Sequence, residues 1–192
     1  RKICNQYGGW QDQVISQMGG IIKLNISKKE KINISKVKSN SLIEKNIKNR
    51  FLLVYTRIKR YSSEVALSQK KRKNEIIYLY DKIKSLNKTI IFSLKNKNPA
   101  HIANLLNEHW KIKKKLSNKI TDKKIDQFFN MLLKKYKFLG GKLIGAGGGG
   151  FFLMVTNNKL KTIKILQKNN IGYIDFMIDN VGSRIIEDQL NK

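Results

Sequence analysis

Acidic residues, histidine, proline and cysteine are all scarce in this 192-residue sequence. Aspartate and glutamate total 13 against 40 lysines and arginines, which gives a formal net charge of +27. The single cysteine, Cys4, excludes an internal disulfide and is consistent with a reducing compartment. His109 has no cysteine, histidine or carboxylate partner at metal-ligand spacing. We therefore interpret His109 and its neighbour Trp110 as packing residues and assign no metal ligand.

Long apolar runs are also absent. No stretch approaches the roughly 20 residues that cross a bilayer, and the first residues lack the pattern of a secretory signal peptide. We expect a cytoplasmic protein without membrane association. The hydrophobic content of 41% permits a real core, and a length of 192 residues allows one domain or one and a half.

The high positive charge raises the alternative of a basic nucleic-acid-binding module, because clustered lysines release counterions from phosphates. The lysines are instead spread through every segment, together with many asparagines and isoleucines, as compositional drift would also produce. Such a module would expose aromatic residues among its lysines. Phe128, Phe129, Phe151 and Phe152 fall on predicted core positions, so nucleic acid is the less favoured partner.

A glycine-rich stretch between two short apolar runs is the most distinctive feature present. Gly145, Ala146, Gly147, Gly148, Gly149 and Gly150 form a predicted turn that requires positive φ angles or close backbone approach. Successive amides in such a turn can form an anion-binding nest, for which phosphate is the natural guest. A flexible hairpin loop is the alternative interpretation.

A second candidate site lies near the start of the sequence. Residues 7–13 form a predicted turn that leads into a short helix over 14–18, a Gly19-Gly20 stop and a strand over 21–26. Asp12 falls in the first turn of this helix, where the macrodipole favours an ionised carboxylate that can act as a general base. An ordinary aspartate that only stabilises its helix is the alternative.

A third candidate follows the apolar strand predicted over residues 50–56. Residues 57–64 crowd three cations and two serine hydroxyls at the end of this strand. Guanidinium groups bind phosphate bidentately and hydroxyls both donate and accept, so the segment suits an anionic or polyhydroxylated ligand. A solvated loop explains it equally well.

The remaining segments predict an α+β fold with helices on one face of a largely antiparallel sheet. Residues 27–50 suggest a ragged strand or hairpin and loop without evident chemistry. Three helices follow: one with its core face over 76–94, one capped by Asn98 with Pro99 first, and one opened by Thr121 and Asp122. A helix over 159–168 and a closing strand over 172–178 complete the chain.

Four ordered motifs resemble the GHMP small-molecule kinases, and most of all the sugar kinases of the heptose 7-phosphate kinase and fucokinase branch. They are Gly8–Gln13 with Gly19-Gly20, Tyr55-Thr56 with Arg60 and Ser62–Glu64, Trp110 with Lys113-Lys114 and Leu116-Ser117, and Gly140–Gly150. The resemblance implies a ferredoxin-like GHMP kinase C-terminal domain over residues 50–192, preceded over 1–49 by the end of the α/β N-terminal domain. The family's main phosphate loop is not in the sequence. We therefore expect that loop and the Mg²⁺ ligands upstream, and no activity from these residues alone.

The resemblance also implies roles for individual residues. Asp12 would orient or deprotonate the sugar hydroxyl that attacks the γ-phosphate of ATP, and Gly145 to Gly150 would close the site beside the phosphates. On the substrate side it places Gly9, Trp10, Gln11, Thr56, Arg60 and Ser62. The cofactors implied are ATP and Mg²⁺, and the partner is a small sugar or sugar phosphate.

One residue departs from the family pattern. The family often has glycine after the threonine, whereas this sequence has Arg57. A bulky cation there can alter or block the sugar pocket. A non-catalytic remnant that keeps the fold therefore stays open as an alternative, and the sequence does not indicate an oligomeric state.

Overall fold

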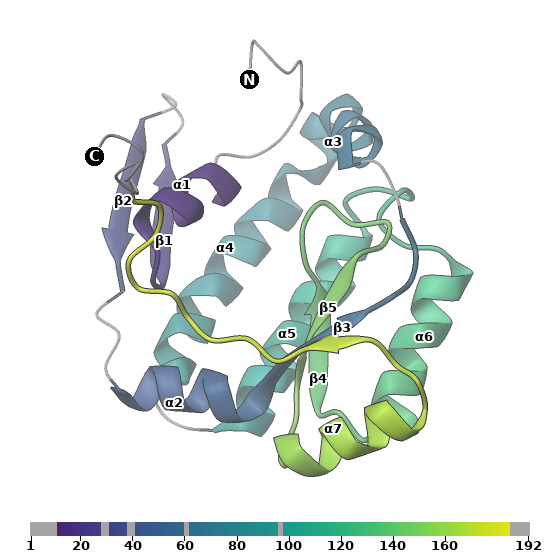
Figure 1. The fold of residues 1–192 in the computed structure, drawn as a ribbon. Helices are drawn as coiled ribbons and strands as arrows, with labels where there is room; N and C mark the ends of the chain where they lie inside the picture. The colour runs from purple at the N-terminus through teal and green to yellow at the C-terminus, as the bar shows by residue number, and fades with distance from the viewer. Residues whose placement is uncertain (1–10, 28–30, 38–40, 60–61, 96–97, 185–192) are drawn as a thin grey trace, which may run out of the picture.

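The computed structural model describes residues 11–27, 31–37, 41–59, 62–95 and 98–184 (Figure 1). Its helices are α1 (Gln11–Met18), α2 (Ser41–Arg50), α3 (Ser62–Lys71), α4 (Lys73–Lys95), α5 (Pro99–Lys114), α6 (Lys123–Lys134) and α7 (Lys159–Lys168). Its strands are β1 (Ile22–Ile26), β2 (Ile32–Lys36), β3 (Phe51–Tyr55), β4 (Gly140–Leu143), β5 (Phe151–Val155) and β6 (Tyr173–Ile174). Three predicted site residues, Gly9, Trp10 and Arg60, lie outside the described residues.

The main sheet has the strand order β4-β5-β3-β6, and every neighbouring pair is antiparallel. Strand β3 is followed by helices and then β4, and β5 is followed by α7 and then β6. Two strand–helix–strand units interleaved in this way form a ferredoxin-like arrangement. The predicted α+β class and the antiparallel sheet are confirmed.

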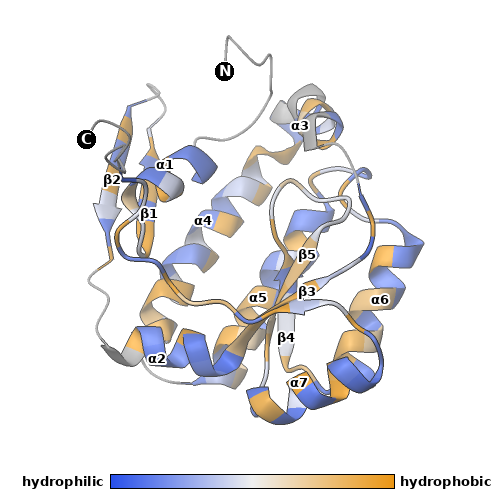
Figure 2. Ribbon diagram, in the orientation of Figure 1, coloured by the Kyte–Doolittle hydropathy of each residue, from blue (hydrophilic) through white to orange (hydrophobic). Residues whose placement is uncertain are grey.

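One face of this sheet carries the main core. Because successive side chains of a strand point to opposite faces, Leu52 and Val54 of β3 share a face with their cross-strand partners Met154 and Phe152. All four are fully buried in one cluster with side chains of α6 and α7, among them Leu132 and Leu166. Figure 2 shows the same pattern, with apolar residues concentrated on the central strands and on the sides of the helices that meet them.

Aromatic packing fixes α5 and α6 on this face. Trp110 is 1% exposed and meets the ring of Phe152 edge-on, with 5.7 Å between ring centroids. The ring centroids of Phe129 and Phe152 are 5.1 Å apart. The prediction that Trp110 is a packing residue is confirmed, whereas Phe128 and Phe151 are only half-buried.

The predicted helix starts are confirmed at two positions. The side chain of Asn98 accepts a hydrogen bond from the His101 amide at 3.0 Å, and Pro99 occupies the first turn of α5. The side chain of Asp122 accepts from the Ile125 amide at 2.8 Å and caps α6.

Three segments differ from the sequence-based expectation. Residues 27–50 contain one strand, β2, which forms a hairpin with the preceding β1. They also contain α2, whose short apolar stripe is too weak a signal among lysines and asparagines. The loop expected over 57–64 ends early, because α3 begins at Ser62. The closing strand is limited to Tyr173–Ile174. Among the described residues, no helix is both long and apolar enough to cross a membrane.

Candidate functional site

The glycine-rich turn links β4 to β5 and has the backbone that the sequence predicts. Gly145 has a φ of 68°, Gly147 of 121°, Gly148 of 79°, Gly149 of 145° and Gly150 of 89°. Residues with a Cβ rarely adopt the larger of these angles. The backbone conformation of the turn therefore requires glycine at these positions.

Two loops hold the second half of the turn. The Gly148 amide donates to the Ile120 carbonyl at 2.7 Å, and the Gly150 amide donates to the Ile58 carbonyl at 3.0 Å. The approach is close, since a Cβ on Gly149 would lie 2.3 Å from the Ile58 oxygen and one on Gly147 would lie 3.0 Å from Ile120. Glycine is needed here both for its φ and for space.

Three other amides of the turn have no hydrogen-bond acceptor among the described residues. The hydrogen bonds recorded within the described residues include no acceptor for the amides of Ala146, Gly147 or Gly149. A Cβ on Gly145 or on Gly150 would meet no atom within 4 Å, so space is open at both ends of the turn. Free amides beside open space suit an anion such as a phosphate.

Thr56 belongs to this site through the turn itself. Its hydroxyl donates to the Gly150 carbonyl at 2.9 Å and accepts from the Ile58 amide at 3.2 Å, and its backbone amide also donates to Gly150. The side chain is only 7% exposed. Thr56 therefore ties the end of β3 to the glycine turn.

Arg57, the residue that departs from the family pattern, contacts the segment after α7 rather than the glycine turn. Its guanidinium donates to the Asn170 carbonyl at 2.6 Å, at the end of α7. Its φ of 60° lies in the left-handed region that glycine occupies freely, at a cost of about 1–2 kcal/mol for another residue. A glycine in this place would avoid that cost.

A buried lysine supports the first half of the turn. Lys113 of α5 donates from Nζ to the Leu143 carbonyl at 2.9 Å and to the Gly145 carbonyl at 2.6 Å. Burial, reinforced by the charge of Lys142, lowers the Lys113 pKa from 10.5 to about 7. Burial likewise lowers the Lys142 pKa to about 8.

His109 completes a buried basic cluster with these two lysines. Its Nε2 lies 3.2 Å from Lys142 Nζ. Burial first, and then the charges of Lys142 and Lys113, lower the His109 pKa to about 3. The imidazole is therefore neutral near pH 7. His109 is buried, as the sequence predicts, and it also contacts Lys142.

Asp12 lies apart from the turn, on α1. It occupies the first turn of that helix, as predicted, and Gln11 is the first residue of the same helix. The segment after β6 anchors α1, because Ser183 donates to the Ser16 carbonyl from its amide at 2.8 Å and from its hydroxyl at 2.9 Å. In Figure 1 both α1 and the β4–β5 turn lie at the upper end of the molecule, with α4 between them in that view.

The structure therefore brings together one group of the predicted residues. Thr56 and Gly145 to Gly150 meet, whereas Asp12 and Gln11 lie on α1, and Ser62 begins α3. Sequence reasoning did not identify the contacts of Ile58, Ile120 and Lys113 with the turn. Only Lys113 had a signal, as part of the Trp110–Ser117 motif. Among the described residues, no three His, Cys, Asp or Glu side chains gather to hold a metal ion.

Comparisons with known proteins support the fold. Residues 91–175 match the family model of the GHMP kinases C terminal. The D-glycero-D-manno-heptose 1-phosphate kinase from Bacteriodes thetaiotaomicron is structurally similar, with a TM-score of 0.69 at 19% identity over 97% of this chain and 52% of that chain. A putative sugar kinase from Campylobacter jejuni has a TM-score of 0.63 at 20% identity over 95% of this chain and 52% of that chain.

The Methanococcus jannaschii mevalonate kinase has higher identity and less overlap. It is 28% identical, with a TM-score of 0.56 over 77% of this chain and 45% of that chain. A search of curated proteins found no match to the sequence. The chain has the fold of the GHMP kinase C-terminal domain and spans about half the length of these solved structures.

Proposed function

We propose that the protein carrying this chain is an ATP-dependent kinase that phosphorylates a hydroxyl of a sugar or sugar phosphate. The observation that carries the proposal is the glycine turn, whose amides at Ala146, Gly147 and Gly149 have no acceptor within the described residues. The turn lies in a domain that matches the GHMP kinases C-terminal model. Phosphoryl transfer depends on positioning and charge stabilisation more than on reactive side chains. A phosphate-binding nest and one carboxylate can therefore contribute to such a reaction.

The roles divide between the two ends of the chain. ATP, with Mg²⁺ at its phosphates, supplies the phosphoryl group. The turn from Gly145 to Gly150 would hold phosphate oxygens through its free amides, while Thr56 keeps the turn in place from β3. Asp12 would orient or deprotonate the attacking hydroxyl, with Gly9, Trp10, Gln11, Arg60 and Ser62 on the substrate side. Residues 1–49 would belong to the N-terminal domain of the kinase, and the enzyme would work in the cytoplasm.

A sugar is favoured over mevalonate by the motif resemblance, which is strongest to the sugar kinases. Within the sugar class we propose a heptose 7-phosphate-like or fucose-like acceptor, following the motif resemblance. Arg57 does not contradict this, because its guanidinium is held at Asn170.

The direct test is ADP release by the full-length protein with ATP and Mg²⁺. The acceptors to compare are a heptose 7-phosphate, fucose and mevalonate, and turnover with one of the first two is expected. Turnover with mevalonate alone would move the protein to another branch of the family. Absence of turnover together with absence of ATP binding would support the non-catalytic remnant.

A substitution in the turn tests its part in nucleotide use. Gly147→Val should lower stability by roughly 3 kcal/mol and weaken ATP use, because valine tolerates a φ of 121° poorly and its Cβ would press on Ile120. Gly172→Ala is the control, since a Cβ there meets Tyr55 at an ordinary 3.4 Å. Unchanged ATP kinetics in Gly147→Val would show that the turn is only a hairpin.

A further inference from the structure

We propose that Lys113 is a positioning residue for phosphate binding: its side-chain nitrogen fixes the first half of the glycine turn and thereby aims the Ala146 amide at the phosphate. The proposal rests on the proposed kinase function. It assigns a role to a buried side chain on α5 that does not itself touch the nucleotide.

The geometry around Lys113 is that of a clamp. Its Nζ bridges two carbonyls, one at the last residue of β4 and one at the first residue of the turn, at 2.9 Å from Leu143 and 2.6 Å from Gly145. Two short hydrogen bonds from one nitrogen set the relative position of both carbonyls. The strand end and the turn are therefore held as one unit.

The planarity of the peptide bond transmits this constraint to the amides. In a trans peptide the carbonyl of one residue and the amide of the next point in opposite directions. The Leu143 carbonyl faces Lys113, and the next amide, that of Ile144, accordingly donates across the sheet to Phe151 at 3.0 Å. By the same rule the Gly145 carbonyl faces Lys113, so the Ala146 amide is directed away from the buried lysine.

The first half of the turn depends on this clamp more than the second half does. Gly148 and Gly150 are bound to the Ile120 and Ile58 carbonyls, and Thr56 adds two further bonds to Gly150. Gly145 lies beside open space, since a Cβ on this residue would meet no atom within 4 Å. In the described part of the chain, Lys113 is the side chain that holds Gly145.

A lysine at this buried position is unfavourable if its role is only to pack. Lys113 is 8% exposed, and its recorded side-chain partners within the described residues are two carbonyls rather than a carboxylate. It also lies near Lys142 and His109, and both the burial and the neighbouring charge disfavour its charged form. An apolar residue of similar volume would pack at lower cost. The hydrogen bonds to the turn give a reason for the lysine.

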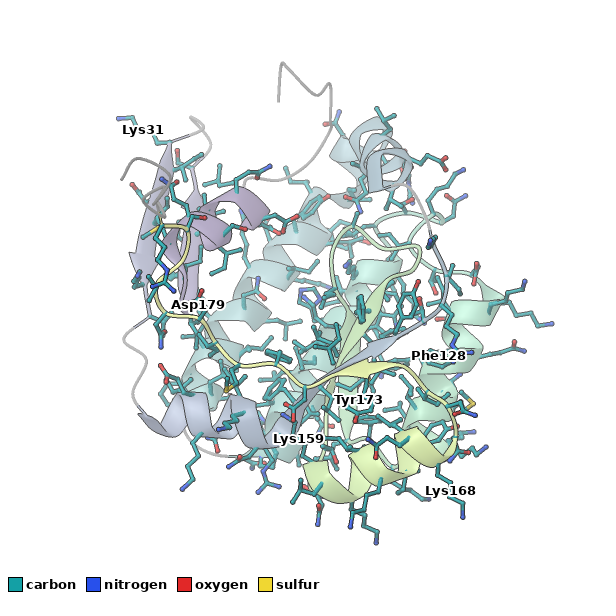
Figure 3. All side chains as sticks on the ribbon, viewed as in Figure 1. Lys31, Phe128, Lys159, Lys168, Tyr173 and Asp179 are labelled. Atoms are coloured by element: carbon teal, nitrogen blue, oxygen red, sulfur yellow. The ribbon has the colours of Figure 1, made fainter. Side chains whose placement is uncertain are left out.

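The experiment compares two buried lysines in the full-length protein. Lys113→Met removes the donor and keeps much of the packing volume. Lys159→Met is the control, because Lys159 is also 8% exposed and also donates to a backbone carbonyl, that of Lys48, but it pairs in addition with the Asp175 carboxylate, as Lys113 does not. Lys159 begins α7 just after β5, at the end of that strand opposite the glycine turn, and it is labelled in Figure 3.

Two measurements are made on each variant: the Kd for ATP by calorimetry, and hydrogen exchange of the peptide covering residues 144–150. Lys113→Met should raise the Kd about tenfold or more and speed up exchange in that peptide, since small misplacements of positioning groups have effects up to ~100-fold. Lys159→Met should lower the melting temperature but change neither the Kd for ATP nor the hydrogen exchange of residues 144–150. If Lys113→Met fails to fold, Lys113→Gln, which keeps a shorter neutral donor, takes its place.

The possible outcomes separate this inference from the kinase proposal. Wild-type Kd and exchange in the Lys113 variant would overturn the positioning role while leaving the kinase intact. Equal weakening of ATP binding by both lysine variants would also overturn it, because loss of stability alone would then explain the effect. If the unaltered protein does not bind ATP, the kinase proposal and the phosphate role of Lys113 both fail, and the exchange result then shows only whether Lys113 holds the turn.

Discussion

Replacing Asp12 by asparagine in the full-length protein should, under the proposed kinase function, lower kcat by about 10²–10⁴-fold and leave the KM for ATP nearly unchanged. Asparagine keeps the size of the side chain and removes the charge that would orient or accept the proton of the attacking hydroxyl. Asp12 is exposed in the first turn of α1, where it is accessible to a substrate. The hydrogen bonds from Ser183 to the Ser16 carbonyl hold α1, and therefore the Asp12 carboxylate, in a fixed position.

The competing explanation for Asp12 is a helix-dipole role, which predicts a different result. Loss of such an interaction costs roughly 0.3–1 kcal/mol of stability and leaves kcat nearly intact. Asp126 is a suitable control, since it lies in the first turn of α6 and pairs with Lys114 at 3.1 Å. Asp126→Asn should reduce the melting temperature without a comparable loss of turnover. If Asp12→Asn behaves like Asp126→Asn, the catalytic assignment is wrong.

Local signals in the sequence were sufficient for most of the fold. Asn98 and Asp122 cap their helices as expected, because an N-cap is decided by neighbouring residues alone. The positive φ angles of the glycine turn follow in the same way from composition. Helix α2 has no strong local period, and its stability comes from tertiary packing. Ile43 is buried, and Ile47 packs against a smaller core cluster made of Phe51, Ile102, Ala103, Leu106 and Val155.

The site was predictable only in part, for a related reason. A nest of glycines can be recognised from its own residues, but the groups that hold it come from distant segments. Ile58 and Ile120 contribute backbone carbonyls, which any residue could supply, so no side-chain pattern marks them. Lys113 lies among the lysines at 111 and 113–115, a composition typical of a solvated helix face, but α5 turns that one lysine inward.

The buried basic cluster leads to a second large expected effect: the protein should become more stable as the pH rises above neutral. Burial lowers the Lys113 pKa from 10.5 to about 7 and the Lys142 pKa to about 8. Between these values and 10.5 the unfolded chain binds protons that the folded protein does not. The free energy of unfolding rises with pH wherever the unfolded state binds more protons.

His109 gives the same sign in a more acidic window. Its pKa is lowered from 6.5 to about 3, so the unfolded chain also binds the extra proton between these two values. Stability should therefore fall as the pH decreases below about 6.5, through this residue alone. All three basic groups favour the folded state at higher pH, in contrast to the usual maximum between about pH 5 and 8.

The two lysines titrate as a coupled pair, so their contributions do not simply add. Lys113 alone should give a rise on the order of 3 kcal/mol from about pH 7 to about pH 10, since one pKa unit corresponds to about 1.4 kcal/mol. For a chain of this length, that corresponds to an increase of about 6–12 °C in melting temperature. Thermal unfolding of the wild type and of Lys113→Met at both pH values checks it. The variant should show a smaller rise, because one of the two lysines no longer titrates and the other loses a charged neighbour. A melting temperature that is flat or falls between these pH values in the wild type would mean that Lys113 and Lys142 remain fully charged in the folded protein.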